Sequence, residues 1–264
     1  MGVRDRRATS GARVPRLRPD PPYAGGVRVW RVELDRPAGA TLGWRLLSGA
    51  ERERALALAD PVERRRYVVA HVALRTVLGG LCGVPADRLA FGRDGSGRPC
   101  LLSPGGRPVP DFNLSHSDAW ALVAVAPPGA RVGVDVERVR AGFDHLEMAR
   151  RFYQPEEVAR LPAEGPDGFF RLWTAKEAYI KASGAGLAGM SDVLVREESA
   201  THATVLSRSA RFPECRVRWL DVAPGYAAAL VAAPPAAVPS SEVASVEAAS
   251  VPVPSSVAAS ILVP

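Results

Sequence analysis

Both lysines of this chain lie in one short segment, together with a glutamate. The 34 basic residues comprise 32 arginines and two lysines, Lys176 and Lys181. Lysine carries a compact ammonium on a thin stem and arginine a wide planar fork, so retaining lysine here indicates a tight site. Glu177 and Lys181 are four residues apart and share one face of a helix. This pattern is typical either of an exposed ion pair or of a site that binds a metal ion and a phosphate.

A pair of carboxylates, Asp135 and Glu137, lies in an apolar segment with strand-like alternation. Residues i and i+2 of a strand point the same way, so both acids leave one face while Val134 and Val136 pack on the other. Neighbouring carboxylates repel unless a cation lies between them, and oxygen ligands suit Mg²⁺. The alternative is an edge strand with a solvated acidic face. Together with Glu177, the pair predicts a site for Mg²⁺, with Mn²⁺ as an alternative ion.

The segment 112–117 combines small hydroxyl residues with a histidine. We interpret it as a loop in which Ser115 and His116 contact a phosphate. The alternative is a turn-capping role without a ligand. A hydrolase triad is disfavoured, because adjacent Ser and His rarely have the required geometry and no Gly-x-Ser-x-Gly motif is present.

The chain carries a net charge of +6 and an isoelectric point of about 9.7. This charge favours an anionic partner such as a phosphorylated ligand, an acidic protein, nucleic acid or a membrane surface. Arginines at 52, 54, 64, 65 and 66 form a predicted cationic patch, although each alone is typical of a solvated helix face. Nucleic-acid binding is disfavoured, because aromatic residues make up 6% of the chain and no binding motif is found.

Composition divides the chain into a folded body and two ends. Residues 1–26 lack apolar periodicity, and residues 234–264 are rich in Ala, Pro, Ser and Val, so both are predicted to be disordered. No signal peptide and no membrane-spanning run are expected. The three widely spaced cysteines are interpreted as ordinary thiols of a cytoplasmic protein.

The body is predicted to contain two similar α+β halves, residues 27–128 and 129–233, with one chain supplying both halves of a monomer. Expected elements are a strand over 27–34, helices over 50–59, 61–81, 146–152, 155–161 and 167–182, and hairpins over 119–138 and 217–232.

Three motifs in this order resemble the 4′-phosphopantetheinyl transferases of the surfactin-synthetase-activating type. They are Phe112–Ser117, Gly133–Glu137 and Trp173–Lys181, and Gly97-Arg98-Pro99 matches a further family motif. The resemblance runs from about residue 47 to 231. It implies a pseudo-dimer of two α+β subdomains with the active site in the cleft between them.

The resemblance also implies the reaction and the roles of the residues. The enzyme would transfer the phosphopantetheine arm of coenzyme A to a serine of an acyl, peptidyl or polyketide carrier protein, releasing adenosine 3′,5′-bisphosphate. Asp135, Glu137 and Glu177 would bind the metal, Glu177 would serve as or orient the base, and Lys181 would contact the diphosphate. Residues implied to lie around the adenosine and its 3′-phosphate are Arg54, Arg66, Arg98, Ser115 and His116.

Two further positions stand out against the family pattern. Glu51 occupies a place where some relatives have a basic 3′-phosphate ligand, so Arg52 or Arg54 is expected to compensate. Glu157 matches a further family carboxylate.

A metal-dependent phosphodiesterase or nuclease is the alternative enzyme class, because such enzymes also combine clustered carboxylates with basic residues. They usually need acids for a second metal ion or a catalytic histidine. Neither pattern is found, which favours the transferase.

Overall fold

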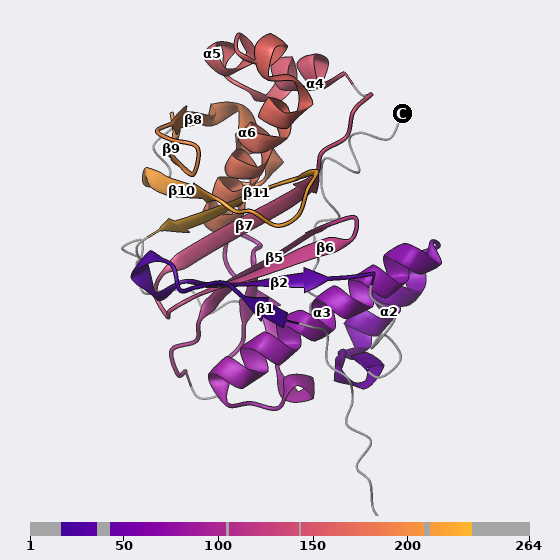
Figure 1. Cartoon of the computed structure of the whole chain (residues 1–264). Helices are drawn as coiled ribbons and strands as arrows, with labels where there is room; N and C mark the ends of the chain where they lie inside the picture. Colours follow the sequence, from indigo (N-terminus) through magenta and orange to yellow (C-terminus); the bar gives the residue numbers. More distant parts are fainter. Residues whose placement is uncertain (1–16, 36–42, 104–105, 143, 209–211, 234–264) are drawn as a thin grey trace, which may run out of the picture.

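The structure is a computed structural model that describes residues 17–35, 43–103, 106–142, 144–208 and 212–233 (Figure 1). Of the segments predicted to be disordered, 1–16 and 234–264 lie outside these residues. The prediction is wrong for residues 17–26. Strand β1 (Leu17–Pro19) pairs antiparallel with β2 (Arg28–Glu33), and Leu17 packs against the N-terminal core. Pairing with β2 orders this segment despite its polar composition.

The N-terminal half is a four-stranded sheet covered by a long helix. Its strand order is β1-β2-β6-β5, where β5 is Asp111–Ser117 and β6 is Trp120–Ala126. Helix α3 (Pro61–Cys82) begins after an Asp60 cap and ends at Gly83, whose φ of 66° suits glycine. Its apolar stripe, including Leu74 and Leu78, packs on the sheet. Helix α2 (Gly49–Ala57) packs against α3, and a small hairpin, β3 (Phe91–Arg93) and β4 (Pro99–Leu101), completes this half.

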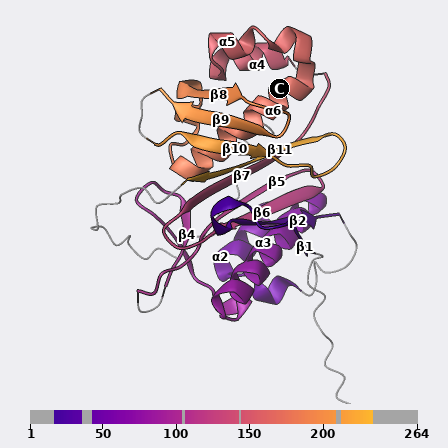
Figure 2. The ribbon, with the colours of Figure 1, turned by 60° about the vertical axis from the view of Figure 1, so that its left-hand side comes forward.

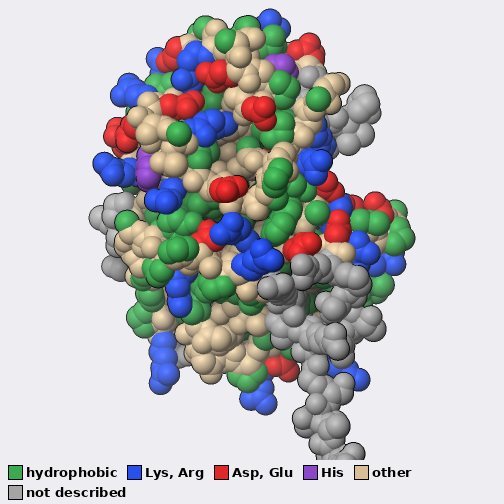
Figure 3. All heavy atoms as spheres, viewed as in Figure 1, with side chains coloured by type: hydrophobic (Ala, Val, Ile, Leu, Met, Phe, Trp, Pro, Cys, Tyr) green, Lys and Arg blue, Asp and Glu red, His purple; other side chains and the backbone are tan. Residues whose placement is uncertain are grey.

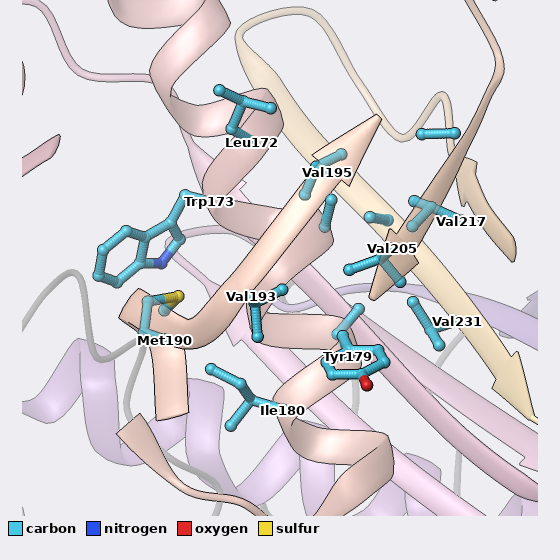
Figure 4. Packing of buried hydrophobic residues seen from close by; sticks show 14 of the residues in the cluster. Leu172, Trp173, Tyr179, Ile180, Met190, Val193, Val195, Val205, Val217 and Val231 are labelled. Atoms are coloured by element: carbon cyan, nitrogen blue, oxygen red, sulfur yellow. The ribbon is translucent and has the colours of Figure 1, made fainter. Parts of the chain in front are cut away.

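The C-terminal half repeats the arrangement with a five-stranded sheet. The strand order is β7-β11-β10-β9-β8, with bounds Arg131–Arg138 (β7), Tyr226–Ala233 (β11), Cys215–Trp219 (β10), His202–Ser207 (β9) and Val193–Glu197 (β8). Helix α6 (Leu161–Ser183) covers this sheet, preceded by α4 (His145–Phe152) and α5 (Pro155–Val158). Figure 4 shows side chains of α6, among them Leu172 and Tyr179, packed against valines of the strands.

The two sheets face each other through a third apolar cluster. Val134 and Val136 of β7 pack there with Leu122 of β6 and Val29 of β2. Helices α3 and α6 lie on the two outer sides, as Figures 1 and 2 show. The predicted α+β fold of two similar halves is therefore confirmed. The exact domain boundaries stay a prediction, with 128/129 falling in the link between β6 and β7.

The predicted hairpin over 119–138 is wrong. Strand β6 pairs with β5, and β7 pairs with β11 in the other sheet, so the link 127–130 crosses from one half to the other. The segment 112–117 is likewise a strand and not a loop. The other predicted hairpin, formed by β10 and β11, is confirmed.

A ladder of side-chain bonds joins the halves where β5 runs parallel to β7. Backbone N–H groups of β7 donate to side-chain oxygens of β5, each 21 residues earlier in the chain: Val132 to Asp111, Val134 to Asn113, Val136 to Ser115 and Arg138 to Ser117. Polar β5 side chains thus satisfy the backbone edge of β7, which buried amides require. This ladder fixes the position of the two acids on β7.

No helix in the described part of the chain is both long and apolar enough to cross a bilayer.

Candidate active site

The site forms where the C-terminal half of α6 lies close against β7. A Cβ at Gly133 would lie only 1.9 Å from the Ala178 carbonyl oxygen, so glycine is required for this approach. Residues 133, 135 and 137 face α6, whereas the intervening valines face the other sheet. This alternation brings Asp135 next to the helix face that carries Glu177 and Lys181, as the spacing predicts.

Lys181, Asp135 and Ser115 form a buried polar cluster at this contact. The Lys181 Nζ lies 2.6 Å from Asp135 Oδ1 and 3.2 Å from Ser115 Oγ, and Ser115 Oγ donates to Asp135 Oδ1 at 2.8 Å. Burial lowers the pKa of Lys181, but the charges of Asp135, Glu177 and Glu137 outweigh it and raise the pKa overall. Lys181 therefore stays an ammonium and neutralises part of the acidic charge.

Glu177 is a buried carboxyl group, and one of its oxygens makes no hydrogen bond. Its side chain is 4% exposed, and its Oε1 has no hydrogen-bond partner. Burial raises its pKa to about 7, Lys181 opposes this rise, and the charge of Asp135 adds to it. Glu177 thus exchanges a proton near neutral pH, which suits a general base. The mutual influence of Asp135 and Glu177 places both in one region.

Two buried carboxyl oxygens of the site suit a hard cation such as Mg²⁺. Asp135 Oδ2 and Glu177 Oε1 are both buried without a hydrogen-bond partner, and such oxygens are the ligands that Mg²⁺ prefers. Glu137 lies on the same face of β7, where it accepts a hydrogen bond from Ser117 Oγ at 2.8 Å. Among the described residues, however, no three acidic, His or Cys side chains are gathered into a metal cluster. The assignment of all three acids to a metal stays a prediction.

A cavity of about 280 Å³ opens beside these residues, between the two halves. It is lined by Glu177 and Lys181 of α6, by Phe112–Leu114 of β5 and by the tip of the β3–β4 hairpin, Ser96–Pro99. Sites of a few hundred Å³ between subdomains are typical of small-molecule binding. The position agrees with the cleft predicted from the resemblance.

His116 is on β5 but is unsuited to bind a phosphate by charge. Burial lowers its pKa to about 3, with further contributions from His71, Lys181 and Arg66, so the imidazole is neutral near pH 7. A neutral imidazole can still donate one hydrogen bond and accept another. The role of His116 and Ser115 beside the adenosine stays a prediction.

The predicted phosphate-binding arginines have protein partners. Arg98 lines the cavity, but its guanidinium binds both oxygens of Asp111 at 2.9 Å and donates to Val132 O at 2.7 Å, clamping the two halves. Arg66 is paired with Asp35, Glu63 and Asp118 at 2.6–2.8 Å. A phosphate would have to replace these carboxylates.

Arg54 is exposed on α2 and does not line the cavity. Glu51 does not line the cavity either. It is buried, caps α2 through Ser48, and pairs with Arg75 at 2.7 Å. The Glu51–Arg75 pair accounts for the glutamate at position 51, because it joins α2 to α3. The compensating role expected of Arg52 or Arg54 stays a prediction.

Comparisons with known proteins agree with this geometry. A family model described as the 4′-phosphopantetheinyl transferase superfamily matches residues 131–231. The 4′-phosphopantetheinyl transferase HetI of Nostoc sp. is 37% identical over 172 residues, which cover 63% of this chain and 72% of HetI. A 4′-phosphopantetheinyl transferase of Bacillus subtilis is 30% identical over 223 residues, covering 79% of this chain and 93% of its own. The chain belongs to the 4′-phosphopantetheinyl transferase superfamily.

The predicted subtype of this transferase is also confirmed. The transferase Sfp of Bacillus subtilis strain 168 is 28% identical over 228 residues, covering 79% of this chain and 93% of Sfp. Among solved structures, the holo-[acyl-carrier-protein] synthase of Thermotoga maritima is 26% identical and covers 39% of this chain and 62% of its own, with a TM-score of 0.33, too low to define the fold. Nothing in these comparisons supports a phosphodiesterase or nuclease.

Sequence reasoning missed the side chains that hold the site of the transferase together. Ser117 positions Glu137, and Asp111 and Asn113 bind the backbone of β7. The signal was present, because Asp111, Asn113, Ser115 and Ser117 alternate with other residues at the period of a strand. That alternation predicts a strand with one polar face.

The second lysine of the transferase has a structural role. Lys176 is fully buried, its Nζ lies 2.7 Å from Glu157 Oε2, and it also donates to the Val193 carbonyl. Glu157 in turn accepts hydrogen bonds from the backbone of Gln154 and Val195. The pair therefore joins α5, α6 and β8.

Lys176→Met is expected to lower the free energy of unfolding by about 3–5 kcal/mol, because it leaves the Glu157 carboxylate buried without its partner. Urea denaturation measures the loss. The matched control is Arg160→Met, which removes an exposed partner of Glu197 and should change stability by about 1 kcal/mol or less. Equal small effects of both variants would show that the buried pair contributes nothing.

The raised pKa of Glu177 predicts a pH-dependent stability of the metal-free transferase. The folded state holds the proton with a pKa of about 7, against an ordinary value of 4.5. The stabilisation is therefore complete below about pH 4.5 and is lost as pH rises through 7, amounting to about 3 kcal/mol at most. Urea denaturation in a chelator at several pH values should show this slope in wild type and a flatter one in Glu177→Gln. Identical slopes would be inconsistent with a raised pKa of Glu177.

Proposed function

We propose that this transferase moves the phosphopantetheine arm of coenzyme A to a serine hydroxyl of an apo-carrier protein and releases adenosine 3′,5′-bisphosphate. Besides the family membership, one observation carries the proposal. Glu177 and Lys181 line the cavity between the two halves, with Asp135 held against Lys181 at 2.6 Å. Glu177, with a pKa of about 7, and the Lys181 ammonium thus both line a cavity that can hold a small molecule.

Coenzyme A would place its diphosphate beside Lys181. Its ammonium is held by Asp135 and Ser115, so it is fixed in place before a ligand arrives. A pre-positioned donor aimed at oxygens that gain charge lowers the barrier for breaking the phosphoanhydride. Glu177, with its pKa of about 7, would accept or orient the proton of the attacking serine.

Mg²⁺, or Mn²⁺ as the alternative, would be held by Asp135, Glu137 and Glu177. The buried oxygens of Asp135 and Glu177 that have no partner support this assignment. When bound, the ion supplies positive charge that neutralises the diphosphate and orients it for in-line attack.

The natural carrier is proposed to be an acidic acyl, peptidyl or polyketide carrier protein. The net charge of +6 would accelerate encounter with an acidic partner and make the rate sensitive to salt. Basic and acidic side chains are interspersed on the face drawn in Figure 3, without one large basic patch. A large basic patch is typical of nucleic-acid-binding surfaces, and this face shows none. We also propose a cytoplasmic monomer, since one chain supplies both sides of the cleft.

The release of adenosine 3′,5′-bisphosphate from coenzyme A tests the reaction class. We expect the nucleotide to form only when Mg²⁺ and an apo-carrier are both present. A carrier whose serine is replaced by alanine serves as the control. Release without any carrier would favour a phosphodiesterase instead and refute the transfer reaction.

Lys181→Arg is expected to lower kcat by about tenfold or more, because the wider guanidinium does not fit where the ammonium is held between Asp135 and Ser115. Carrier modification measured at saturating coenzyme A reports kcat. Arg196→Lys, an exposed exchange on β8, is the control for the arginine–lysine change itself. Full kcat in Lys181→Arg would show that the size of the cation at this position is unimportant.

A further inference from the structure

A second cavity lies in the N-terminal half, apart from the catalytic cleft. Its volume is about 680 Å³, and it shares no lining residue with the cleft between the halves. The end of α3, the base of the β3–β4 hairpin and the link after β6 enclose it. The reaction proposed above makes no use of this space.

The walls of the second cavity are mainly apolar. Leu81 and Val84 line it at the end of α3, and Leu89, Leu101 and Val125 extend it from the N-terminal core. Pro127 and Pro128 of the link close one side. A hydrocarbon chain placed against these walls would lose contact with water where they cover it, which is favourable in proportion to the buried area.

Three arginines are among the residues that line this apolar space. They are Arg28, Arg88 and Arg107, and no acidic residue of the described part of the chain lines the cavity. Among the described residues, none of the three has a carboxylate partner, although Arg28 lies over the Trp30 ring at 5.4 Å. This contrasts with Arg66, Arg75 and Arg98, which are all paired with acids.

We propose that this cavity binds a fatty acid, with its alkyl chain along the apolar walls and its carboxylate at the arginines. Guanidinium groups recognise carboxylates through paired charge-assisted hydrogen bonds. A volume of 680 Å³ is within the roughly 300–1,000 Å³ range of small-molecule sites. The chemistry requires both parts, an anionic head and an apolar chain.

Isothermal titration calorimetry of the full chain with dodecanoate, below its micelle concentration and without coenzyme A, tests the site. We expect saturable binding of one molecule per chain. Dodecan-1-ol, which has the same chain without the charge, should bind at least about tenfold more weakly. Absence of saturable dodecanoate binding, or equal binding of the alcohol, would overturn the proposal.

Two kinds of variant locate the ligand. Arg88→Glu combined with Arg107→Glu should weaken dodecanoate at least about tenfold, because both head-group contacts become repulsive. Ala90→Trp, at an exposed cavity position, should weaken it by filling the space. The control is Arg196→Glu on β8, which should bind as wild type does. Wild-type affinity in both cavity variants would contradict the assignment.

Competition separates this site from the catalytic cleft. Saturating coenzyme A should leave the dodecanoate affinity unchanged, because the two cavities have no residue in common. Displacement of dodecanoate by coenzyme A would place the fatty acid in the cleft and refute a second site. Because binding is measured without a carrier, a failure of the transfer reaction would not affect this result.

Discussion

Glu177→Gln is expected to reduce the rate of phosphopantetheine transfer by about 10²–10⁴-fold, the range typical of a lost general base. The amide has nearly the same shape but accepts no proton, and it is a weaker ligand for a divalent ion. Labelled coenzyme A incubated with an apo-carrier measures turnover. Binding of coenzyme A, measured separately by calorimetry, should persist, because Lys181 keeps its contacts with Asp135 and Ser115.

The control for this variant is Glu147→Gln, an exposed exchange of the same type on α4. It should turn over like the wild type. If Glu177→Gln also retained near wild-type turnover, Glu177 would be neither the base nor a ligand that the reaction requires. Loss of coenzyme A binding as well would show that the residue shapes the pocket and does not act in the chemical step.

Gly133→Ala is expected to damage both stability and activity. The added Cβ would lie 1.9 Å from the Ala178 carbonyl oxygen and 2.7 Å from the Ala182 nitrogen. Both are backbone atoms, so no side-chain rotation relieves the overlap and α6 must move away from β7. Overpacking of this kind typically costs about 1–3 kcal/mol and sometimes more. A shift of about 1 Å between Asp135 and Lys181 would lower the transfer rate by about 10²-fold.

Urea denaturation and the transfer assay measure the two effects of Gly133→Ala. Gly80→Ala is the matched control, because it lies inside α3 with nothing within 4 Å of the added Cβ. We expect that variant to be as stable as wild type or more stable by up to about 1 kcal/mol. Wild-type stability and activity in Gly133→Ala would mean that the close contact between β7 and α6 is not needed.

The limits of helix α3 were predictable, because local residues set them. The start of α6 was not, because the helix begins at Leu161 and not at residue 167. The Asp60 side chain accepts a hydrogen bond from the Val62 N–H at the start of α3, Pro61 suits the first turn, and Gly83 adopts the positive φ that ends the helix. The orientation of the two acids on β7 was also predictable, because successive side chains of a strand point to opposite faces and place the acids and the valines on different sides. The shared helix face of Glu177 and Lys181 follows from their spacing.

The junction between the halves was not predictable from local signals. The turn residues 127–130 suit a tight hairpin and an inter-sheet link equally well, and only the partners of β6 and β7 distinguish them. Strand β5 was mistaken for a loop because its polar side chains bind the backbone of a distant strand.

The arginine partners were hidden for a related reason. Arg66 pairs with Asp35, 31 residues earlier, and Arg98 of the β3–β4 hairpin pairs with Asp111 of β5, 13 residues later. A sequence shows that a cation is present but does not show which carboxylate the fold brings to it. Arginines that look suited to a phosphate therefore turn out to be partly neutralised within the protein.

Intact-protein mass spectrometry of an apo acyl carrier protein, incubated with coenzyme A, Mg²⁺ and the enzyme, tests the proposed site most directly. We predict the addition of one phosphopantetheine group by wild type and by Glu147→Gln, and no addition in the same time by Asp135→Asn combined with Glu177→Gln. Full modification of the carrier by the double variant would contradict a reaction that depends on these two buried acids.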